Sequence, residues 1–391
     1  MSNSGTALPP KILMVAGEAS GDMHAADLVH HLRQLSMAAP TPAPQFYGMG
    51  GGALRELGLS PLLPMEPVSV IGLVEVLRHL PQIWTTFQGL VRSLDQEHPT
   101  LAVLVDFPDF NLRLAKKIKQ RGIPIVWYIS PQLWAWREHR VHTFKRLVDR
   151  MIVLFPFEVE FYRKYDMEVT FVGHPLVDRV RVTRSPLEVR RELGLRDDQR
   201  VVALLPGSRR SELKMYLEPM LAAAERLAHH NPQLHFVLPL ARSLQPADLA
   251  PYLQRYRVPL TWRQGMSYEL TQIAEAAVVA SGTATLETAL IGTPMIILGR
   301  VSRLTELWLR RVANLPYYGL VNFVMGEKCV TELIQQSVTP ENIVTDVIRL
   351  LEDSAEQARL QDCYADIRHR LGDGGAAQRA ANAIWPMVIQ R

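Results

Sequence analysis

Short, mostly apolar runs of strand length alternate along this chain with longer segments that carry a helical pattern. In the first half such runs lie at 12–15, 46–49, 101–105, 125–129, 151–154 and 169–172. After a proline- and arginine-containing break at 176–198 the alternation starts again, with runs at 201–205, 235–238, 259–262, 277–280 and 295–298. Runs that are apolar throughout are typical of parallel strands buried on both faces. The pattern predicts an α/β protein with two Rossmann-like, doubly wound domains that face each other across a cleft.

The two blocks also set the expected domain boundaries. We expect residues 1–10 to be a flexible tail, 11–180 the first domain and 181–365 the second. A glycine-rich hinge at 372–375 lies in the last segment, 366–391. The helix after this hinge is expected to pack either on the first domain or on the partner subunit of a homodimer.

The segment AAVVASGTATLETAL at 276–290 predicts a strand, a capping turn and a helix start. A helix that begins just past the carboxyl end of a parallel strand directs its free N–H groups into the crevice where anions bind. Ser281, Gly282 and Thr283 form the turn, and Glu287 follows one turn into the helix. Glu287 either accepts hydrogen bonds from the two hydroxyls of a ribose or is a first-turn acid favoured by the helix dipole.

A second turn of this kind, LLPGSRRSE at 204–212, follows the first strand of the second block. Gly207 allows the backbone to turn tightly, and Ser208 offers a hydroxyl. Arg209 carries a guanidinium group whose geometry suits phosphate oxygens. The simpler interpretation is a capped helix start with two solvated arginines, and we favour the phosphate site because Arg209 stands at the carboxyl edge of a strand.

Two acids follow strands of the first block. Asp106 ends the strand 101–105, and Glu18 lies in the glycine-containing turn AGEASGD after the strand 12–15, which lacks the GxGxxG spacing of a dinucleotide site. Asp109 or Asn111 can be explained as the cap of the following helix, whereas Asp106 cannot. Asp106 is therefore the first candidate for a general base, with Glu18 as the competing acid.

The segment 68–91 carries an apolar stripe at helical spacing that includes Leu77, Leu80 and Trp84. Further apolar residues widen the stripe beyond one helix face. Two interpretations remain open: a buried core helix with a kink at Pro81, or an apolar surface that contacts lipid.

Composition excludes several classes of protein. The 391 residues are 48% hydrophobic and 21% charged, which is typical of a globular protein, and the net charge is only +4. A small positive excess suits nucleotide phosphates or an anionic membrane, but no zinc-ligand spacing or basic helix indicates nucleic acid. Two cysteines fit a reducing compartment. No apolar run reaches the length of about eighteen residues that a membrane span needs, and no signal peptide is evident, so a cytosolic protein is expected.

Five segments together resemble the lipid-A-disaccharide synthase family of Gram-negative-type bacteria. These are AGEASGD (16–22), DFPDFN (106–111), SPQLWAWR (130–137), LLPGSRRSE (204–212) and SGTATLE (281–287). The similarity in order and spacing runs from about residue 11 to the C-terminus. It implies a GT-B glycosyltransferase that joins UDP-2,3-diacylglucosamine to 2,3-diacylglucosamine 1-phosphate through a β-1,6 bond and releases UDP. It also implies inversion at the anomeric carbon, no cofactor or bound metal, and action at the inner face of the cytoplasmic membrane.

The resemblance also implies roles for individual residues. Asp106 would be the catalytic aspartate, Arg209 would bind diphosphate and Glu287 would bind ribose, while His174 is expected to be structural. Arg209–Arg210 stands where the family has an arginine–glycine pair, so either arginine could contact phosphate. The UDP and phosphate side would comprise Gly207, Ser208, Arg209, Gly265, Met266, Ser281, Gly282, Thr283, Glu287 and Asn322. The acceptor and membrane side would comprise Ser20, Leu77, Leu80, Trp84, Trp134 and Trp136, although the last two could equally be ordinary aromatic core.

Two other functions fit the same architecture, because fold alone does not determine activity. One is a UDP-GlcNAc 2-epimerase, which would use cleft acids without an acylated acceptor. The other is a nucleotide-sugar-binding module with no catalysis. An apolar surface on the first domain favours the lipid transferase, whereas the epimerase would need a dry, polar cleft.

Overall fold

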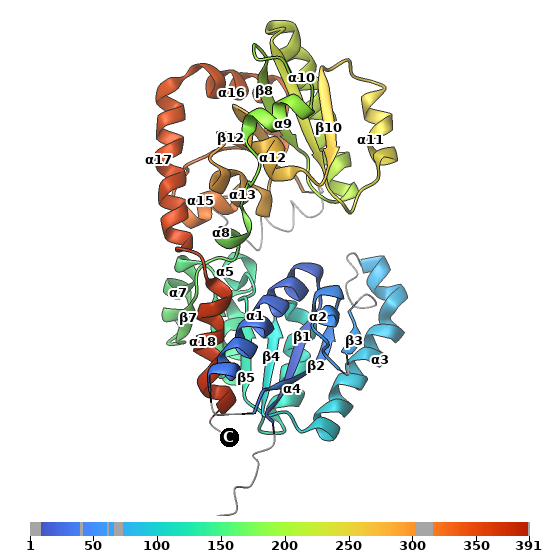
Figure 1. Ribbon diagram of the computed structural model, residues 1–391, viewed down its shortest axis with the longest axis vertical. Helices are drawn as coiled ribbons and strands as arrows, with labels where there is room; N and C mark the ends of the chain where they lie inside the picture. Colours follow the sequence, from blue (N-terminus) through green and yellow to red (C-terminus); the bar gives the residue numbers. More distant parts are fainter. Residues whose placement is uncertain (1–8, 40–41, 61, 66–72, 302–315, 390–391) are drawn as a thin grey trace, which may run out of the picture. The chain divides into compact units, whose positions relative to one another are not determined.

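The computed structural model describes residues 9–39, 42–60, 62–65, 73–301 and 316–389 (Figure 1). The chain divides into two compact units, one formed by Met1–Pro175 with Gly374–Arg391 and the other by Leu176–Asp373. From the sequence we placed the divisions at 180 and 365. The difference arises because α8 (Leu176–Arg179) packs on α13 (Thr283–Ile291), and α17 (Ser354–Leu371) packs on α13 and α15 (Leu320–Met325), all within the second unit.

Seven parallel strands form the sheet of the first unit, in the order β3-β2-β1-β4-β5-β6-β7. Their bounds are β1 (Lys11–Ala16), β2 (Gln45–Gly50), β3 (Leu62–Pro64), β4 (Leu101–Val105), β5 (Ile125–Tyr128), β6 (Arg150–Val153) and β7 (Val169–Phe171). β1 pairs with β2 on one side and with β4 on the other, where Ala16 lies opposite Val105. The order of the strands reverses between β1 and β4, which is the point where a doubly wound sheet opens a crevice for ligands.

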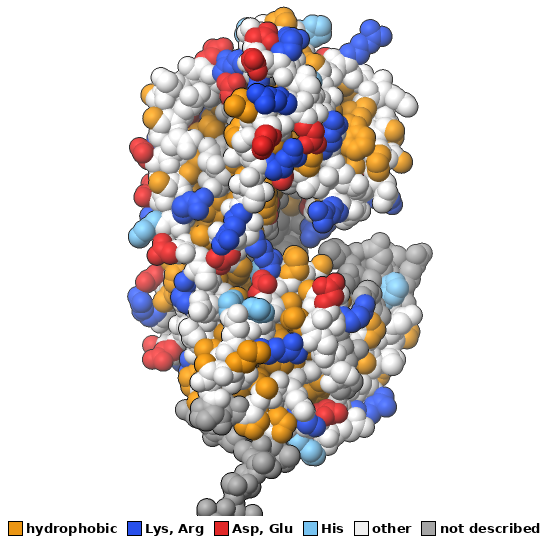
Figure 2. All heavy atoms as spheres, in the orientation of Figure 1, with side chains coloured by type: hydrophobic (Ala, Val, Ile, Leu, Met, Phe, Trp, Pro, Cys, Tyr) orange, Lys and Arg blue, Asp and Glu red, His pale blue; other side chains and the backbone are white. Residues whose placement is uncertain are grey.

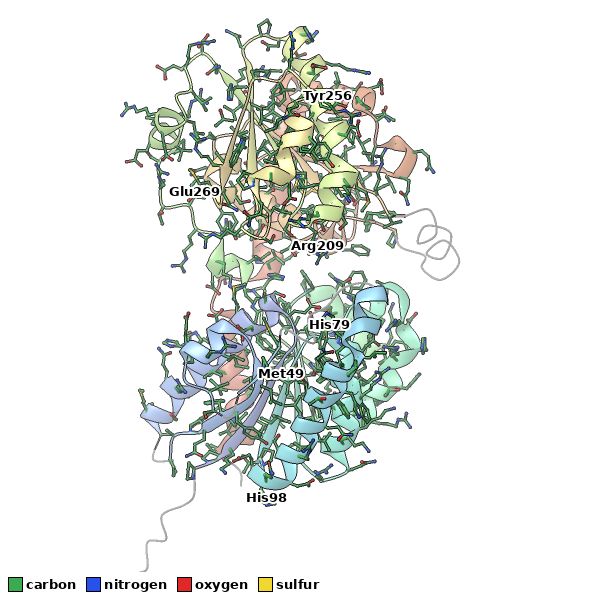
Figure 3. All side chains as sticks on the ribbon, turned by 90° about the vertical axis from the view of Figure 1, so that its right-hand side faces the viewer. Met49, His79, His98, Arg209, Tyr256 and Glu269 are labelled. Carbon is green, nitrogen blue, oxygen red and sulfur yellow. A yellow bond between two sulfur atoms is a disulfide. The ribbon has the colours of Figure 1, made fainter. Side chains whose placement is uncertain are left out.

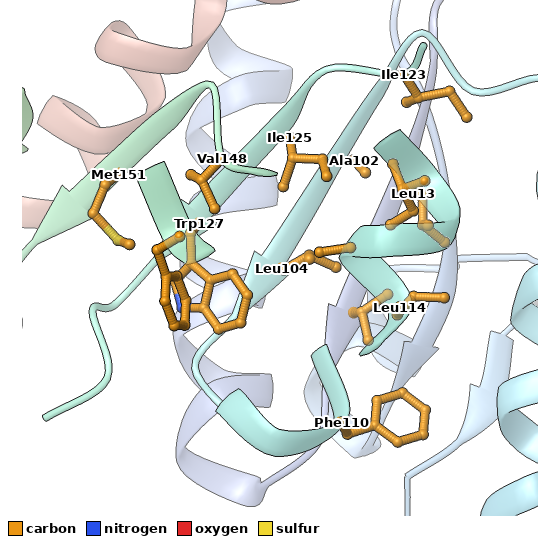
Figure 4. Close-up of a cluster of buried hydrophobic side chains, with 14 of the residues drawn as sticks. Leu13, Ala102, Leu104, Phe110, Leu114, Ile123, Ile125, Trp127, Val148 and Met151 are labelled. Carbon is orange, nitrogen blue, oxygen red and sulfur yellow. The ribbon is translucent and has the colours of Figure 1, made fainter. Parts of the chain in front are cut away.

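Helices cover both faces of this sheet. They are α1 (Ala19–Ala38), α2 (Gly52–Glu56), α3 (Leu73–Glu97), α4 (Pro108–Lys119), α5 (Leu133–Trp136), η1 (Glu138–Arg140), α6 (Val141–Leu147), α7 (Pro156–Arg163) and α18 (Ala376–Ile389). Successive side chains of β1 point to opposite faces. Ile12 therefore enters a core shared with α1 and α18, and Leu13 enters a core shared with α3, α4 and α6. Figure 4 shows part of the core that contains Leu13, and Figure 1 shows α1 and α18 side by side.

Six parallel strands form the sheet of the second unit, in the order β10-β9-β8-β11-β12-β13. Their bounds are β8 (Arg200–Leu205), β9 (Leu234–Leu240), β10 (Leu260–Gln264), β11 (Ala276–Ala280), β12 (Met295–Gly299) and β13 (Thr331–Ile334). The order reverses between β8 and β11. The remaining helices of this unit are α9 (Pro186–Glu192), α10 (Arg210–His230), α11 (Pro246–Leu253), α12 (Ser267–Gln272), η2 (Gln335–Ser337) and α16 (Pro340–Glu352).

Two further findings differ from the sequence predictions. The edge strands β3 and β13 were not predicted, because neither has an apolar run of strand length: β3 covers only Leu62–Pro64, and β13 (Thr331–Ile334) contains a glutamate. Cys329 and Cys363, which suggested a reducing compartment, form a disulfide with their Cα atoms 6.4 Å apart. The bond joins the loop before β13 to α17, a proximity that local sequence does not reveal.

None of the helices in the described part of the chain is long and apolar enough to cross a membrane. On the face shown in Figure 2, basic and acidic side chains are interspersed over both units, in keeping with the small net charge of +4.

Candidate active site

A cavity of about 500 Å³ opens in the second unit at the carboxyl ends of β8, β9, β10 and β11. This is the point where the strand order reverses, and therefore where a ligand is expected. Eight residues that we assigned to UDP or phosphate line the cavity: Gly207, Ser208, Arg209, Gly265, Ser281, Gly282, Thr283 and Glu287. Figure 3 labels Arg209 at the start of α10.

The amino end of α13 faces this cavity. Gly282 is the N-cap residue, with a φ of 154° that glycine adopts without strain. No side chain of the described residues caps this end, and only the Thr285 N–H of the first turn is bonded, to the Gly282 carbonyl at 3.2 Å, so the end of the helix can bind an anion. Ser281 lines the cavity, but its Oγ donates to the carbonyl oxygen of Tyr318 at 2.7 Å. The hydroxyl of Ser281 therefore holds the neighbouring backbone in place.

Glu287 lies beyond the first turn of α13, so the interpretation of this residue as a first-turn acid is wrong. Its side chain lines the cavity, and Tyr268 Oη donates to Glu287 Oε1 at 2.9 Å. Burial raises the pKa of Glu287, and the hydrogen bond from Tyr268 opposes this shift. Tyr268 thus orients a carboxylate that can accept hydrogen bonds from a sugar.

Glu212 occupies the backbone donors at the start of α10. Its Oε2 accepts hydrogen bonds from the N–H groups of Ser208 at 2.7 Å and Arg209 at 3.1 Å. Gly207 makes this possible, because a side chain there would collide with Glu212. Side chains such as Arg209, which is largely exposed and only 3.3 Å from Glu212, can bind an anionic ligand at this turn in place of these two N–H groups. Sequence reasoning missed Glu212, although the capping-box spacing contained the signal.

The neighbouring Arg210 is directed elsewhere. Its Nε lies 3.0 Å from Asp248 Oδ1, and Arg210 does not line the cavity. Of the two adjacent arginines, Arg209 is the one that borders the cavity.

Two predicted residues of the UDP and phosphate side are not brought to the cavity lining. Met266 precedes α12 as its N-cap residue. Asn322 is fully buried: its Nδ2 donates to the Val330 carbonyl and to Glu332 Oε1, each at 2.9 Å, and its Oδ1 accepts from the Val330 N–H at 2.9 Å. Its amide therefore closes the loop between α15 and β13.

In the first unit, Asp106 and Glu18 follow β4 and β1, the two strands between which the order reverses. Burial raises the pKa of Asp106 to about 6, with a further contribution from the charge of Glu18. Glu18 itself is exposed at the N-cap of α1. A carboxyl group with this pKa is partly protonated near neutral pH and can exchange a proton there.

The backbone at Asp106 is held in an uncommon conformation. Asp106 and Phe107 have φ values of 45° and 48°, and Ile129, at the end of the adjacent strand, has a φ of 70°. The Asp106 N–H donates to the Tyr128 carbonyl at 2.9 Å, and Asn111 Nδ2 donates to the Asp106 carbonyl at 2.8 Å. Strain of this kind in non-glycine residues is often found at functional sites.

The prediction that Asp109 or Asn111 caps α4 is wrong. Phe107 is the N-cap residue, and no side chain makes the capping hydrogen bond. Asp109 instead accepts hydrogen bonds from Arg137 at 2.8 Å and Arg140 at 2.6 Å. Burial raises the pKa of Asp109, but these two arginines outweigh it and lower the pKa overall. A carboxylate of this kind is a weaker base than Asp106.

A buried acid near Asp106 also escaped prediction. Glu158 is 2% exposed, and its Oε2 accepts the N–H groups of Leu154 at 3.1 Å and Phe155 at 3.0 Å at the start of α7. Burial raises the pKa of Glu158 to about 7, and the charge of Asp106 adds to this effect. The FPFE sequence at 155–158 contained the capping spacing, but nothing in it indicated proximity to Asp106.

Helix α3 has an inner and an outer face. Phe87 packs edge-on against Phe110 of the core at 5.7 Å, and Leu90 is fully buried. On the outer side, Leu80 is 47% and Trp84 61% exposed, so these two residues are not core. The helix continues through Pro81. The predicted segment 68–72 and the side chain of Leu77 lie outside the described residues.

The remaining predicted residues are dispersed over the first unit. Ser20 is exposed in the first turn of α1. Trp134 is half-buried and packs edge-on against Phe157 at 5.0 Å, and the side chain of Trp136 lies outside the described residues. His174 is buried against the Phe155 ring, 4.9 Å away. Over the described chain, no group of three His, Cys, Asp or Glu side chains is placed to hold a metal ion.

Two doubly wound parallel sheets, each with polar residues at the point where its strand order reverses, define the GT-B architecture of nucleotide-sugar enzymes. Solved structures share this fold at low sequence identity. A UDP-GlcNAc 2-epimerase from Neisseria meningitidis aligns with a TM-score of 0.64 and 13% identity over 96% of this chain and 100% of its own. The glycotransferase of kitacinnamycin aligns with a TM-score of 0.62 and 17% identity over 97% and 99%.

Sequence comparison identifies the family within this class. The family model of lipid-A-disaccharide synthetase matches residues 12–383, and the chain belongs to this family. A lipid-A-disaccharide synthase of Trichlorobacter lovleyi is 42% identical over 382 residues, which are 98% of each chain. The protein is therefore a glycosyltransferase.

Proposed function

We propose that this enzyme joins UDP-2,3-diacylglucosamine to 2,3-diacylglucosamine 1-phosphate through a β-1,6 bond, which yields lipid A disaccharide 1-phosphate and UDP. The family match over residues 12–383 carries the proposal. The cavity of the second unit supports it, because one lining combines a free helix amino end, Arg209 and the carboxylate of Glu287. These groups suit the diphosphate and the ribose of a UDP-sugar.

Asp106 is the general base in this proposal. Its carboxylate takes the proton from the 6-hydroxyl of the acceptor while the oxygen attacks the anomeric carbon of the donor. The bond from this carbon to the diphosphate oxygen breaks, and its electron pair leaves with UDP. Attack from the face opposite UDP inverts the anomeric centre. The pKa of Asp106, about 6, lies below neutral pH, so the group is mostly ionised there. Because this pKa is higher than that of an ordinary aspartate, the carboxylate is also a better proton acceptor.

Arg209 and the amino end of α13 would take up the negative charge that develops on the departing UDP. Preorganised donors aimed at developing charge are among the largest contributions to catalysis, and they can fill the role that a metal ion has in other transferases. The proposal therefore requires no bound metal.

The enzyme would act on these lipids while bound peripherally to the inner face of the cytoplasmic membrane. The exposed Leu80 and Trp84 on the outer face of α3 support this part of the proposal. Arg137 and Arg140, the basic residues expected to contact anionic headgroups, are both paired with Asp109. Membrane binding would then depend mainly on the apolar residues of α3.

The test is incubation with UDP-2,3-diacylglucosamine and 2,3-diacylglucosamine 1-phosphate, followed by mass spectrometry for the disaccharide and assay of UDP. We expect both products in equal amounts and none without the acceptor. UDP-GlcNAc incubated without the acceptor should remain unchanged. Its conversion to a 2-epimer, with no disaccharide from the acylated pair, would instead establish the epimerase that the fold also permits.

A further inference from the structure

We propose that Arg242 is a second cation that binds the diphosphate of the nucleotide donor, beside Arg209, in the cavity of the second unit. The inference rests on the proposed function and extends it by a residue outside the recognised motifs. Arg242 lies in the loop between β9 and α11 and lines the same cavity as Arg209 and the amino end of α13.

Arg209, Arg210 and Arg242 differ in their partners. Arg209 lies 3.3 Å from the carboxylate of Glu212, and Arg210 lies 3.0 Å from that of Asp248. Arg242 is exposed, and within the described residues no side chain or backbone group forms a hydrogen bond or ion pair with it. Its guanidinium group can therefore bind an anionic ligand without first breaking an ion pair with a carboxylate of the protein.

The position of Arg242 is set by its neighbours. Gly265 has a φ of 75°, and a Cβ atom there would lie only 3.0 Å from Arg242 Nε, so the lack of a side chain at 265 leaves space for the arginine. Ser243 Oγ donates to the Ser208 carbonyl at 2.7 Å, and Gln264 Nε2 donates to the Leu244 carbonyl at 2.8 Å. The loop that carries Arg242 is thus attached to the phosphate turn on one side and to the β10 turn on the other.

The charges that line the cavity give Arg242 a function. The ionisable side chains of the lining are Arg209, Arg242, Glu212 and Glu287. With both arginines the lining is balanced, and the partial positive charge of α13 favours an anion. Without Arg242, the lining would carry an excess of negative charge, which would repel a diphosphate. Arg242 therefore determines whether the cavity attracts the charged part of the donor.

The test compares binding of UDP and of uridine to the full-length protein by calorimetry. Replacing Arg242→Gln should raise the Kd for UDP by about tenfold or more, the loss expected for a hydrogen bond to a charged group, and leave uridine binding unchanged. Arg242→Lys keeps the charge but loses the planar fork, so its Kd for UDP should lie between those of wild type and Arg242→Gln. Arg257→Gln, an exposed position that does not line the cavity, is the matched control and should bind UDP like the wild type.

The possible outcomes separate this inference from the proposed function. Unchanged UDP affinity in Arg242→Gln would overturn the inference while disaccharide synthesis by the wild type still supported the function. Equal losses for UDP and uridine would place Arg242 against the base or ribose and overturn the diphosphate assignment. If Arg242→Gln does not fold, the Arg242→Lys variant decides. A Kd for UDP equal to that of the wild type, at low and at high salt, would contradict binding of the diphosphate by the guanidinium group of Arg242. If the wild-type protein binds UDP but makes no disaccharide, the proposed function is refuted, whereas the inference that Arg242 binds the diphosphate still holds.

Discussion

Replacing Asp106 with asparagine separates its chemical role from its structural one. Asparagine keeps the shape of the side chain and tolerates the left-handed φ of 45° at this position, so the backbone should remain intact. The amide cannot accept the proton of the acceptor hydroxyl. We therefore expect turnover to fall by roughly 10²–10⁴-fold, the usual contribution of a positioned base, with little change in UDP binding.

The same change should stabilise the fold at neutral pH. The pKa of Asp106 is raised from 3.8 to about 6, so the folded protein holds this proton more tightly than the unfolded chain. The stability that the protonated group contributes is complete below about pH 4 and is lost as the pH rises through about 6. At 1.36 kcal/mol per pKa unit, the ionised carboxylate costs about 3 kcal/mol above pH 7, and Asp106→Asn should recover most of it.

Two measurements check this reasoning. In the wild type, kcat/KM should rise with pH and level off above about pH 6. Glu18→Gln should remain active, but the rise in kcat/KM should occur at lower pH, because the negative charge of Glu18 no longer raises the pKa of Asp106. Thermal unfolding of Asp106→Asn should show its gain in stability at pH 7.5 and little gain at pH 4. The assignment fails if Asp106→Asn keeps most of its turnover, or if Asp109→Asn or Glu18→Gln loses turnover while Asp106→Asn does not.

Three further predictions concern the donor cavity and α3. Arg209→Ala should weaken UDP binding by roughly 1.5–3 kcal/mol, measured by calorimetry. Arg210→Ala should leave UDP binding unchanged, because the side chain of Arg210 pairs with Asp248. The activity of the wild type should survive excess EDTA. Glu287→Gln should weaken uridine as well as UDP, because the contact is to ribose; a loss confined to UDP would contradict this. Leu80→Ser with Trp84→Ser should move protein from the membrane fraction to the soluble one at nearly unchanged melting temperature, since both side chains are exposed; loss of the folded state would mean that they are core.

Much of the donor cavity could be predicted because a doubly wound sheet gathers its ligand residues at strand ends. An apolar run followed by a capping turn marks such an end directly in the sequence, as at Gly207 and Gly282. The edge strands β3 and β13 have no comparable signal, because β3 covers only three residues and β13 contains a glutamate. Arg242 also follows a strand, but its role depends on the space above Gly265, more than twenty residues away.

Roles that depend on a distant partner could not be predicted. The resemblance suggested Asn322 as a phosphate ligand, yet its side-chain amide is hydrogen-bonded to Val330 and Glu332. Asp109 looked like a helix cap from its local position, yet Arg137 and Arg140 approach it from another loop. In each case the side chain's hydrogen-bonding capacity was evident in the sequence, but the group that uses it was not.

The two strand-order reversals differ in their backbone in a way that matches the two halves of the proposed reaction. In the second unit the positive φ values at the cavity belong to glycines 207, 265 and 282, which cost little strain and leave space for a ligand. In the first unit they belong to Asp106 and Phe107 at the end of β4, with Ile129 at the end of the neighbouring β5, and each costs of order 1–3 kcal/mol. An anion site needs open backbone and free donors, so glycine suffices. A general base needs a carboxylate held in a partly desolvated position, and only a residue with a side chain can supply it. The strain at Asp106 is thus the expected consequence of placing a base, and it favours Asp106 over the exposed Glu18.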